Sequence, residues 1–172
     1  MHNAFTVRLL SVALLVCGVA VPAWAQEPAP AYVAGDSLVP FTLQDQHGEP
    51  GSVDEKTRVV LFAADMDGGD LVGSALEADA SLQDLAQFGA VFVSDIHRMP
   101  ALITRLFALP SMRRRPYRML LDREPGPTVR LPREEGRVTV LRLDGLTVQS
   151  VSFVADAAGI AAALRPETEP AP

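Results

Sequence analysis

Five side chains near the middle of the sequence are of types that bind metal ions or transfer protons: Asp65, Asp67, Asp70, Asp95 and His97. The first three follow a continuous apolar run at residues 58–64, and the other two follow a second run at residues 90–94. If the two runs are neighbouring parallel strands, their carboxyl ends meet at one edge of a sheet, and these groups converge. Carboxylate oxygens are ligands that calcium and magnesium prefer, so a divalent cation is the one cofactor that these residues suggest.

The same residues also have structural interpretations, which the sequence leaves open. Asp70 is a good N-cap for a helix that starts after it, and Asp67 with Gly68 is typical of a turn. Asp95 and His97 would then be exposed loop residues. The spacing of the acids is not that of an EF-hand loop, so the metal site remains a hypothesis.

One enzyme class shares part of this pattern. A buried strand followed by Asp-x-Asp-Gly is similar to the motif of haloacid-dehalogenase-like phosphatases, in which Asp65 would be the nucleophile and Asp67 the acid/base of a metal-dependent reaction. Against it, Gly69-Asp70 replaces the usual Thr-Leu, and no lysine follows Lys56 to neutralise a phosphate. A metal-dependent phosphatase therefore stays an alternative.

A second group of candidate residues is basic and comprises Arg113, Arg114, Arg115 and Arg118. Residues 26–97 carry 2 basic and 13 acidic side chains, whereas residues 98–142 carry 11 arginines and 4 acids. Guanidinium groups suit a carboxylate or phosphate, so this arginine-rich face is the expected surface for an anion or a protein partner. The alternative is a solvated loop, because loops collect unpaired charge.

The elements that must position these residues are short strands and helices in alternation. Strands are expected at residues 41–43, 58–64, 90–94, 118–121, 138–143 and 148–154. A helix after Asp70 should pack Leu71, Ala75 and Leu82 inward and stop at Gly89. A second helix should begin near Pro100 and end at Pro110, with Leu102, Ile103, Leu106 and Phe107 inward. The last helix is expected at residues 156–164, which gives an α/β sandwich with a mixed sheet.

The N-terminus has the features of a secretory signal peptide. Arg8 precedes an apolar run at residues 9–21, and Ala23-Trp24-Ala25 is a small-residue cleavage site. The run is too short to span a membrane, so we expect export to the periplasm with cleavage after Ala25 and no membrane span in the mature protein. We expect a flexible leader at 26–35, one domain at 36–165 and a disordered proline-rich tail at 166–172. The formal charge of −6 argues against nucleic-acid binding.

At several points the sequence resembles the thioredoxin-like superfamily, in its peroxiredoxin and redoxin branch. A Gly-Asp at 35–36, a Pro-Phe at 40–41 and an Asp-x-x-Gly turn at 45–48 resemble the opening of redoxin domains. Residues 117–122 and 138–145 resemble that family's closing segments. The resemblance implies a thioredoxin-like three-layer sandwich, with a mixed sheet, a C-terminal β-hairpin and a final helix.

The sequence departs from that family at the residues that carry its redox chemistry. It places the Cys-x-x-Cys motif on residues 67–70, where aspartate occupies both sulfur positions, and Gly136-Arg137 stands where a cis-proline is expected. Cys17 is the single cysteine, and it would leave with the signal peptide. Disulfide exchange and peroxide reduction require a thiolate. We therefore expect no catalytic residue of the thiol type.

The sequence therefore predicts an exported, cysteine-free, thioredoxin-like protein of a bacterium, with a non-redox binding or accessory role. Two enzyme alternatives remain: the phosphatase, and an oxidoreductase with a bound cofactor. The second has no motif support, because no Gly-x-Gly-x-x-Gly fingerprint occurs.

Overall fold

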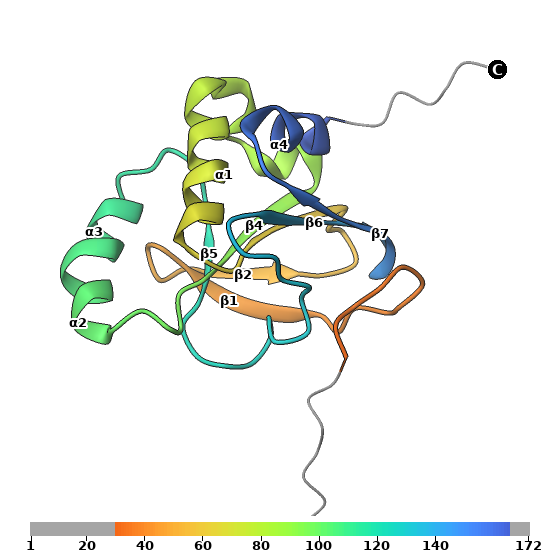
Figure 1. The fold of residues 1–172 in the computed structure, drawn as a ribbon, viewed down its shortest axis with the longest axis horizontal. Helices are drawn as coiled ribbons and strands as arrows, with labels where there is room; N and C mark the ends of the chain where they lie inside the picture. Colours follow the sequence, from red (N-terminus) through yellow and green to blue (C-terminus); the bar gives the residue numbers. More distant parts are fainter. Residues whose placement is uncertain (1–29, 166–172) are drawn as a thin grey trace, which may run out of the picture.

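Seven strands form one mixed sheet in the order β2-β1-β5-β4-β3-β6-β7 (Figure 1). The structure is a computed structural model and describes residues 30–165. The strands are β1 (Phe41–Asp45), β2 (Pro50–Val53), β3 (Val59–Ala63), β4 (Ala90–Asp95), β5 (Leu120–Asp122), β6 (Val138–Asp144) and β7 (Thr147–Val154). Six of them overlap the strands predicted from the sequence, and β2 was not predicted. This confirms the α/β class with a mixed sheet, a C-terminal hairpin and a final helix.

The three central strands run parallel, and their neighbours on both sides run antiparallel. β3 pairs in parallel with β4, and β4 pairs in parallel with β5. β6 pairs antiparallel with β3, while β1 pairs antiparallel with β5. The expected parallel pairing of the two apolar runs is confirmed, so the segments that follow β3, β4 and β5 emerge at one edge of the sheet.

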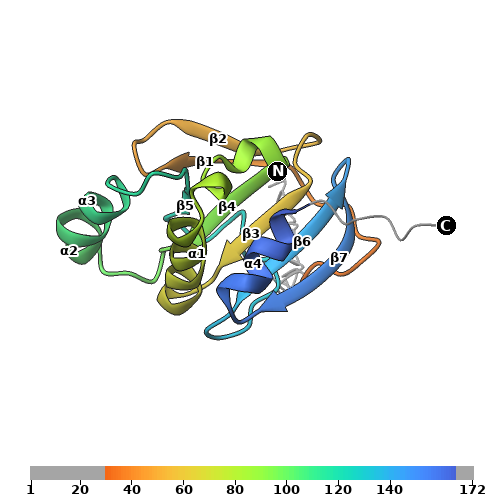
Figure 2. The ribbon, with the colours of Figure 1, turned by 90° about the horizontal axis from the view of Figure 1, so that it is seen from above.

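One face of the sheet is covered by α1 (Met66–Ala78) and α4 (Ala157–Leu164), as Figures 1 and 2 show. Val72, Leu76, Ile160 and Leu164 join the core beneath them. The N-cap of α1 is Asp65, so the prediction that Asp70 caps this helix is wrong. The cap lies earlier because the Asp65 carboxylate accepts the Gly68 N–H, the bond that an N-cap makes three residues ahead.

Two 3₁₀ turns carry the chain from α1 to β4, namely η1 (Ala80–Leu82) and η2 (Leu85–Phe88). The Asp79 side chain accepts the Ser81 N–H at the start of the first turn. Gly89 ends the second turn in the left-handed conformation at φ 62°, as its predicted role as a stop signal requires.

The other face of the sheet is covered by irregular chain within the described residues. Tyr32, Leu38 and Leu131 are buried against Phe62 on that face. The Tyr32 N–H donates to Arg130 O at 2.9 Å, and the Arg130 guanidinium lies 4.0 Å from the centre of the Tyr32 ring. Tyr32 is therefore packed into the domain, within the segment 26–35 that the sequence predicts as a flexible leader.

The predicted signal peptide at residues 1–25, the leader residues before 30 and the predicted tail at 166–172 lie outside the described residues. Between residues 30 and 165, no helix is both long enough and apolar enough to cross a membrane.

The helical segment between β4 and β5 differs most from the prediction. It consists of α2 (Ala101–Ile103), a π-helical turn η3 (Thr104–Ala108) and α3 (Leu109–Met112). The four apolar side chains expected to face inward are exposed, because none of the described elements packs over them: Leu102, Ile103, Leu106 and Phe107. Pro110 also does not end the helix. It lies in the first turn of α3, where the N–H that proline lacks is not required.

Candidate functional site

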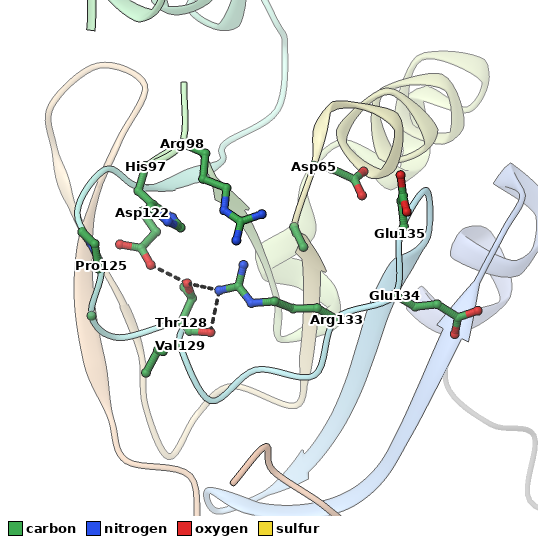
Figure 3. Close-up of a pocket in the computed structure, with 12 residues that line it drawn as sticks. Asp65, His97, Arg98, Asp122, Pro125, Thr128, Val129, Arg133, Glu134 and Glu135 are labelled. Carbon is green, nitrogen blue, oxygen red and sulfur yellow. Dashed lines mark hydrogen bonds between the residues drawn. The ribbon is translucent and has the colours of Figure 1, made fainter. Parts of the chain in front are cut away.

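A cleft of about 570 Å³ opens where β3, β4 and β5 end (Figure 3). Asp65 lies on the wall that follows β3, and His97 and Arg98 lie on the wall that follows β4. Asp122, the last residue of β5, and the loop at residues 123–137 close the remaining side. The cleft occupies the position where open α/β sheets usually bind ligands.

Asp65 joins two segments that are far apart in the sequence. Its Oδ1 accepts the Gly68 N–H at 2.8 Å, and its Oδ2 accepts the Gly136 N–H at 2.9 Å. A Cβ atom at Gly68 would lie 2.9 Å from the Arg137 carbonyl oxygen, so only glycine allows this close approach. The loop before β6 is thus fastened onto the first turn of α1, and both Asp65 oxygens have donors from the protein itself.

Asp95 is also fully engaged. Its Oδ1 contacts the His97 Nδ1 at 2.5 Å and accepts the His97 N–H at 3.1 Å, and its Oδ2 accepts from the Arg133 Nη1 at 2.5 Å. The side chain is only 2% exposed. Burial by itself would raise the pKa of Asp95, but the hydrogen bonds from Arg133 and His97 outweigh it and hold that pKa below its usual value. Asp95 is therefore an ionised structural anchor at neutral pH.

Arg133 holds the cleft wall in place and was not among the residues predicted from the sequence. Its Nη2 donates to the Thr128 carbonyl oxygen at 3.0 Å, and its guanidinium lies 5.0 Å from the centre of the Phe62 ring. Thr128 in turn donates its hydroxyl to Asp122 Oδ2, and Figure 3 shows these links. Only the folded loop brings Arg133 to Asp95, so no local sequence pattern indicates its role.

Two charged side chains on the cleft wall remain without a partner. Arg98 extends into the cleft (Figure 3), and within residues 30–165 its guanidinium makes no hydrogen bond or ion pair. Glu135, on the opposite wall beside Asp65, also has no side-chain partner in the described part of the chain. The two aspartates that line the cleft, Asp65 and Asp122, both accept hydrogen bonds from the protein itself. Arg98 is therefore the cation that the cleft offers to a ligand.

The five residues of the predicted metal site do not converge. Asp65, Asp95 and His97 lie near the same edge of the sheet, as expected, but Asp67 and Asp70 are exposed on α1. Within residues 30–165, no three His, Cys, Asp or Glu side chains are placed to hold a metal ion. The reason is the early start of the helix, which puts Asp67 and Asp70 in helical positions rather than in a loop. This geometry does not provide a preformed site for a divalent cation.

The four arginines of the predicted partner surface also do not form an open cluster. Arg113 Nε donates to the Gln46 carbonyl oxygen at 2.9 Å, and Arg115 pairs with Glu77. Arg118 Nε donates to Asp45 Oδ2 at 2.9 Å. Arg114 alone among the four has no side-chain partner within residues 30–165. Three of these arginines therefore stabilise the fold.

Asp45, the partner of Arg118, is a second anchored aspartate. Burial would raise its pKa, but the N–H groups of Glu49 and His47, together with Arg118, outweigh burial and keep the pKa below its usual value. Asp45 therefore stays ionised and holds the β1–β2 turn against β5.

The geometry does not favour the phosphatase hypothesis. Both oxygens of Asp65 accept backbone N–H groups, so its carboxylate caps α1 and holds the loop before β6. Asp67 is exposed in the first turn of α1 and is not paired with Asp65 as an acid/base would be.

Comparison with known proteins identifies the architecture. Peroxidoxin BcpB from Mycobacterium tuberculosis superposes with a TM-score of 0.51 and 20% identity, covering 80% of this chain and 99% of that protein. The chain has a thioredoxin-like fold. Mycobacterium tuberculosis AhpC superposes on the same thioredoxin-like fold with a TM-score of 0.50 and 15% identity, covering 78% of this chain and 92% of the other. No protein-family model matches the sequence, and neither does any curated protein.

At these identities the comparisons establish the fold and not the chemistry. The sequence contains a single cysteine, Cys17, and none between residues 30 and 165. One cysteine cannot form an intramolecular disulfide. This chain therefore has a thioredoxin-like fold without a pair of thiols.

Proposed function

We propose that this protein is exported and uses a thioredoxin-like fold to bind an anionic group, without thiol chemistry. The proposal rests on which charged side chains of the cleft have partners in the protein and which do not. The two aspartates that line it, Asp65 and Asp122, are held by donors of the protein itself, while the Arg98 guanidinium has no partner within residues 30–165. Such a site offers an unpaired guanidinium to a carboxylate or phosphate, with the Glu135 carboxylate on the opposite wall.

Titration with small anions tests the binding role directly. Phosphate, succinate and glutamate would be added separately to the purified protein, and the unfolding midpoint followed, because a ligand of the native state raises it with concentration. We expect at least one anion to raise the midpoint of the wild type and not that of Arg98→Ala. Arg105→Ala, which removes an exposed arginine outside the cleft, should respond like the wild type. An equal response in all three proteins would contradict binding at Arg98.

Turnover assays test the exclusion of thiol chemistry. The purified protein would be supplied with a dithiol reductant and assayed for insulin reduction and for hydrogen peroxide consumption. We expect rates equal to those without protein, because thiol exchange needs a thiolate that the cleft does not contain. A protein-dependent rate in either assay would refute the non-redox proposal.

Export is tested separately. N-terminal sequencing of the protein recovered from a periplasmic extract should begin at Gln26, and replacing residues 9–21 with a polar sequence should retain the protein in the cytoplasm.

A further inference from the structure

The two charged side chains of the cleft that have no partner carry opposite charges. The other charged or titratable side chains of its lining are bonded within the protein: Asp65, His97, Asp122, Arg133 and Glu134. Glu134 pairs with Arg137 at 2.9 Å and turns away from the cleft in Figure 3. Arg98 and Glu135 make no side-chain hydrogen bond or ion pair within residues 30–165, with each other or with any other group. The cleft therefore has one unpaired cation and one unpaired anion.

The sheet places these two side chains on opposite sides of the end of β3. At the last residue of that strand, Ala63, the partner in β4 is Ser94 and the partner in β6 is Val138. Arg98 follows β4 by a few residues, and Glu135 precedes β6 by a few residues. Because neighbouring strands are about 4.8 Å apart, the strands on either side of β3 are separated by about 10 Å. The two charges therefore belong to facing walls of the cleft.

The rest of the lining is suited to an apolar chain. Ala64, Pro125 and Val129 contribute apolar surface, and Val129 is 61% exposed. An aliphatic chain that covers this surface removes it from water at no electrostatic cost. The volume of about 570 Å³ is within the range of pockets that hold small molecules.

We infer that the cleft binds a small zwitterion, with its carboxylate at Arg98, its ammonium at Glu135 and a short chain between them. The inference rests on the proposed function, because Arg98 binds the anionic group in both, and it adds the second charge and so the class of ligand. A plain anion would leave the Glu135 carboxylate uncompensated on the facing wall, whereas a zwitterion matches both charges. The separation of the walls favours an ammonium that lies several atoms from the carboxylate.

The test uses a series of ω-amino acids: glycine, β-alanine, γ-aminobutyrate and δ-aminovalerate. Each is compared with the fatty acid of the same carbon number, which lacks the ammonium. Titration of the purified ¹⁵N-labelled protein gives a dissociation constant for each ligand from the Arg98 Nε–H signal, which is identified by its loss in Arg98→Ala. We expect δ-aminovalerate to bind more tightly than valerate, and this advantage to be smallest for glycine over acetate.

A peptide arm identifies the source of the zwitterion. Diglycine has the same number of bonds between its ammonium and carboxylate as δ-aminovalerate, and N-acetylglycine lacks the ammonium. Diglycine that binds more tightly than N-acetylglycine would indicate that short peptides share the site. An advantage confined to δ-aminovalerate would indicate a ligand with an aliphatic chain. Either result supports the inference, because both ligands carry separated charges of opposite sign.

Variants make the test specific to the two charges. Glu135→Gln removes the negative charge and keeps the shape of the side chain. It should bind δ-aminovalerate up to about fivefold more weakly than the wild type, so that the advantage over valerate disappears. Arg98→Ala should bind neither ligand, as followed by backbone amide signals. Glu124→Gln, at an exposed acid of the same loop that does not line the cleft, should bind like the wild type.

The inference is overturned if no zwitterion binds more tightly than its matched control, or if Glu135→Gln keeps the advantage of δ-aminovalerate. If valerate nevertheless binds to the wild type and not to Arg98→Ala, the proposed function stands without the inference. If neither these carboxylates nor phosphate bind in a way that depends on Arg98, the proposed function fails as well.

Discussion

Asp65 and Gly68 together let a loop close over the first turn of α1. The Asp65 carboxylate caps α1 and also binds the Gly136 N–H, while the absence of a side chain at Gly68 lets the Arg137 carbonyl approach the same turn. The first turn of the helix is therefore covered by the protein's own loop.

Two neighbouring glycines give opposite predictions for stability. Gly68→Ala would place a Cβ atom 2.9 Å from the Arg137 carbonyl oxygen, so we expect a loss of about 1–3 kcal/mol in the free energy of unfolding. Gly69→Ala has open space around its Cβ and should gain about 0.5–1 kcal/mol, because alanine favours the helix. Urea unfolding of both variants measures the difference, and equal effects would contradict the close contact.

Asp95 predicts how stability depends on pH. Its pKa is lower in the folded protein than in the unfolded chain, so its contribution is present above the unfolded value of about 3.9 and is lost as pH falls through the folded value. We expect Asp95→Asn to lower the free energy of unfolding at pH 7 and to flatten its decline below about pH 4. Asp84→Asn, at an exposed aspartate, should follow the wild-type curve.

At the residue scale, sequence reasoning located the right edge of the sheet but not the roles of its residues. It placed Asp65, Asp95 and His97 together because the carboxyl ends of parallel strands meet. It assigned the helix cap to Asp70 because both Asp65 and Asp70 have cap-forming side chains, and local patterns do not rank them. The role of Arg133 was not predicted, because its partner Asp95 is remote in the sequence.

At the scale of elements, the strands were predictable and the 101–112 segment was only partly so. A continuous apolar run predicts a strand that is buried on both faces of the sheet, and β3 is buried at every position. The spacing of Leu102, Ile103, Leu106 and Phe107 predicts a helix equally well, but periodicity does not reveal whether a neighbour covers the apolar face. β2, with the sequence Pro-Gly-Ser-Val, has one strand-forming residue, Val53, and depends on its pairing with β1.

Two phenylalanines test this reading of the elements. Phe92→Ala empties a buried position in β4 and should cost about 3–5 kcal/mol of the free energy of unfolding. Phe107→Ala, at a side chain that is 66% exposed, should change it by no more than about 0.5 kcal/mol. A large loss from Phe107→Ala would mean that the segment packs inward, as the sequence pattern suggested.

At the scale of the whole molecule, the order of strands and helices predicted the fold but did not predict the cleft. Alternating strands and helices, then a hairpin and a helix, indicated the mixed sheet. The cleft depends on the loop at residues 123–137, which has no periodic pattern and is held by long-range contacts from Arg133 and Asp65. Such contacts form only in the folded protein, and no local sequence pattern predicts them.

The distribution of acids over the molecule predicts its response to metal ions. Calcium, magnesium, manganese and zinc should leave the unfolding midpoint unchanged, because within residues 30–165 no three suitable side chains meet. The double variant Asp67→Asn with Asp70→Asn should behave like the wild type in the same titrations. A midpoint that rises with one metal in the wild type and not in the double variant would restore the metal-site hypothesis.

The closed first turn of α1 also bears on any attempt to introduce thiols into this protein. The Arg137 carbonyl closes the turn over Gly68, next to the Asp65 carboxylate, whereas Asp67 and Asp70 are exposed on the helix. Cysteines at positions 67 and 70 would leave Gly68 and Asp65 unchanged, so the loop would keep its place. The new thiols would then face solvent from a turn whose other side the protein already covers.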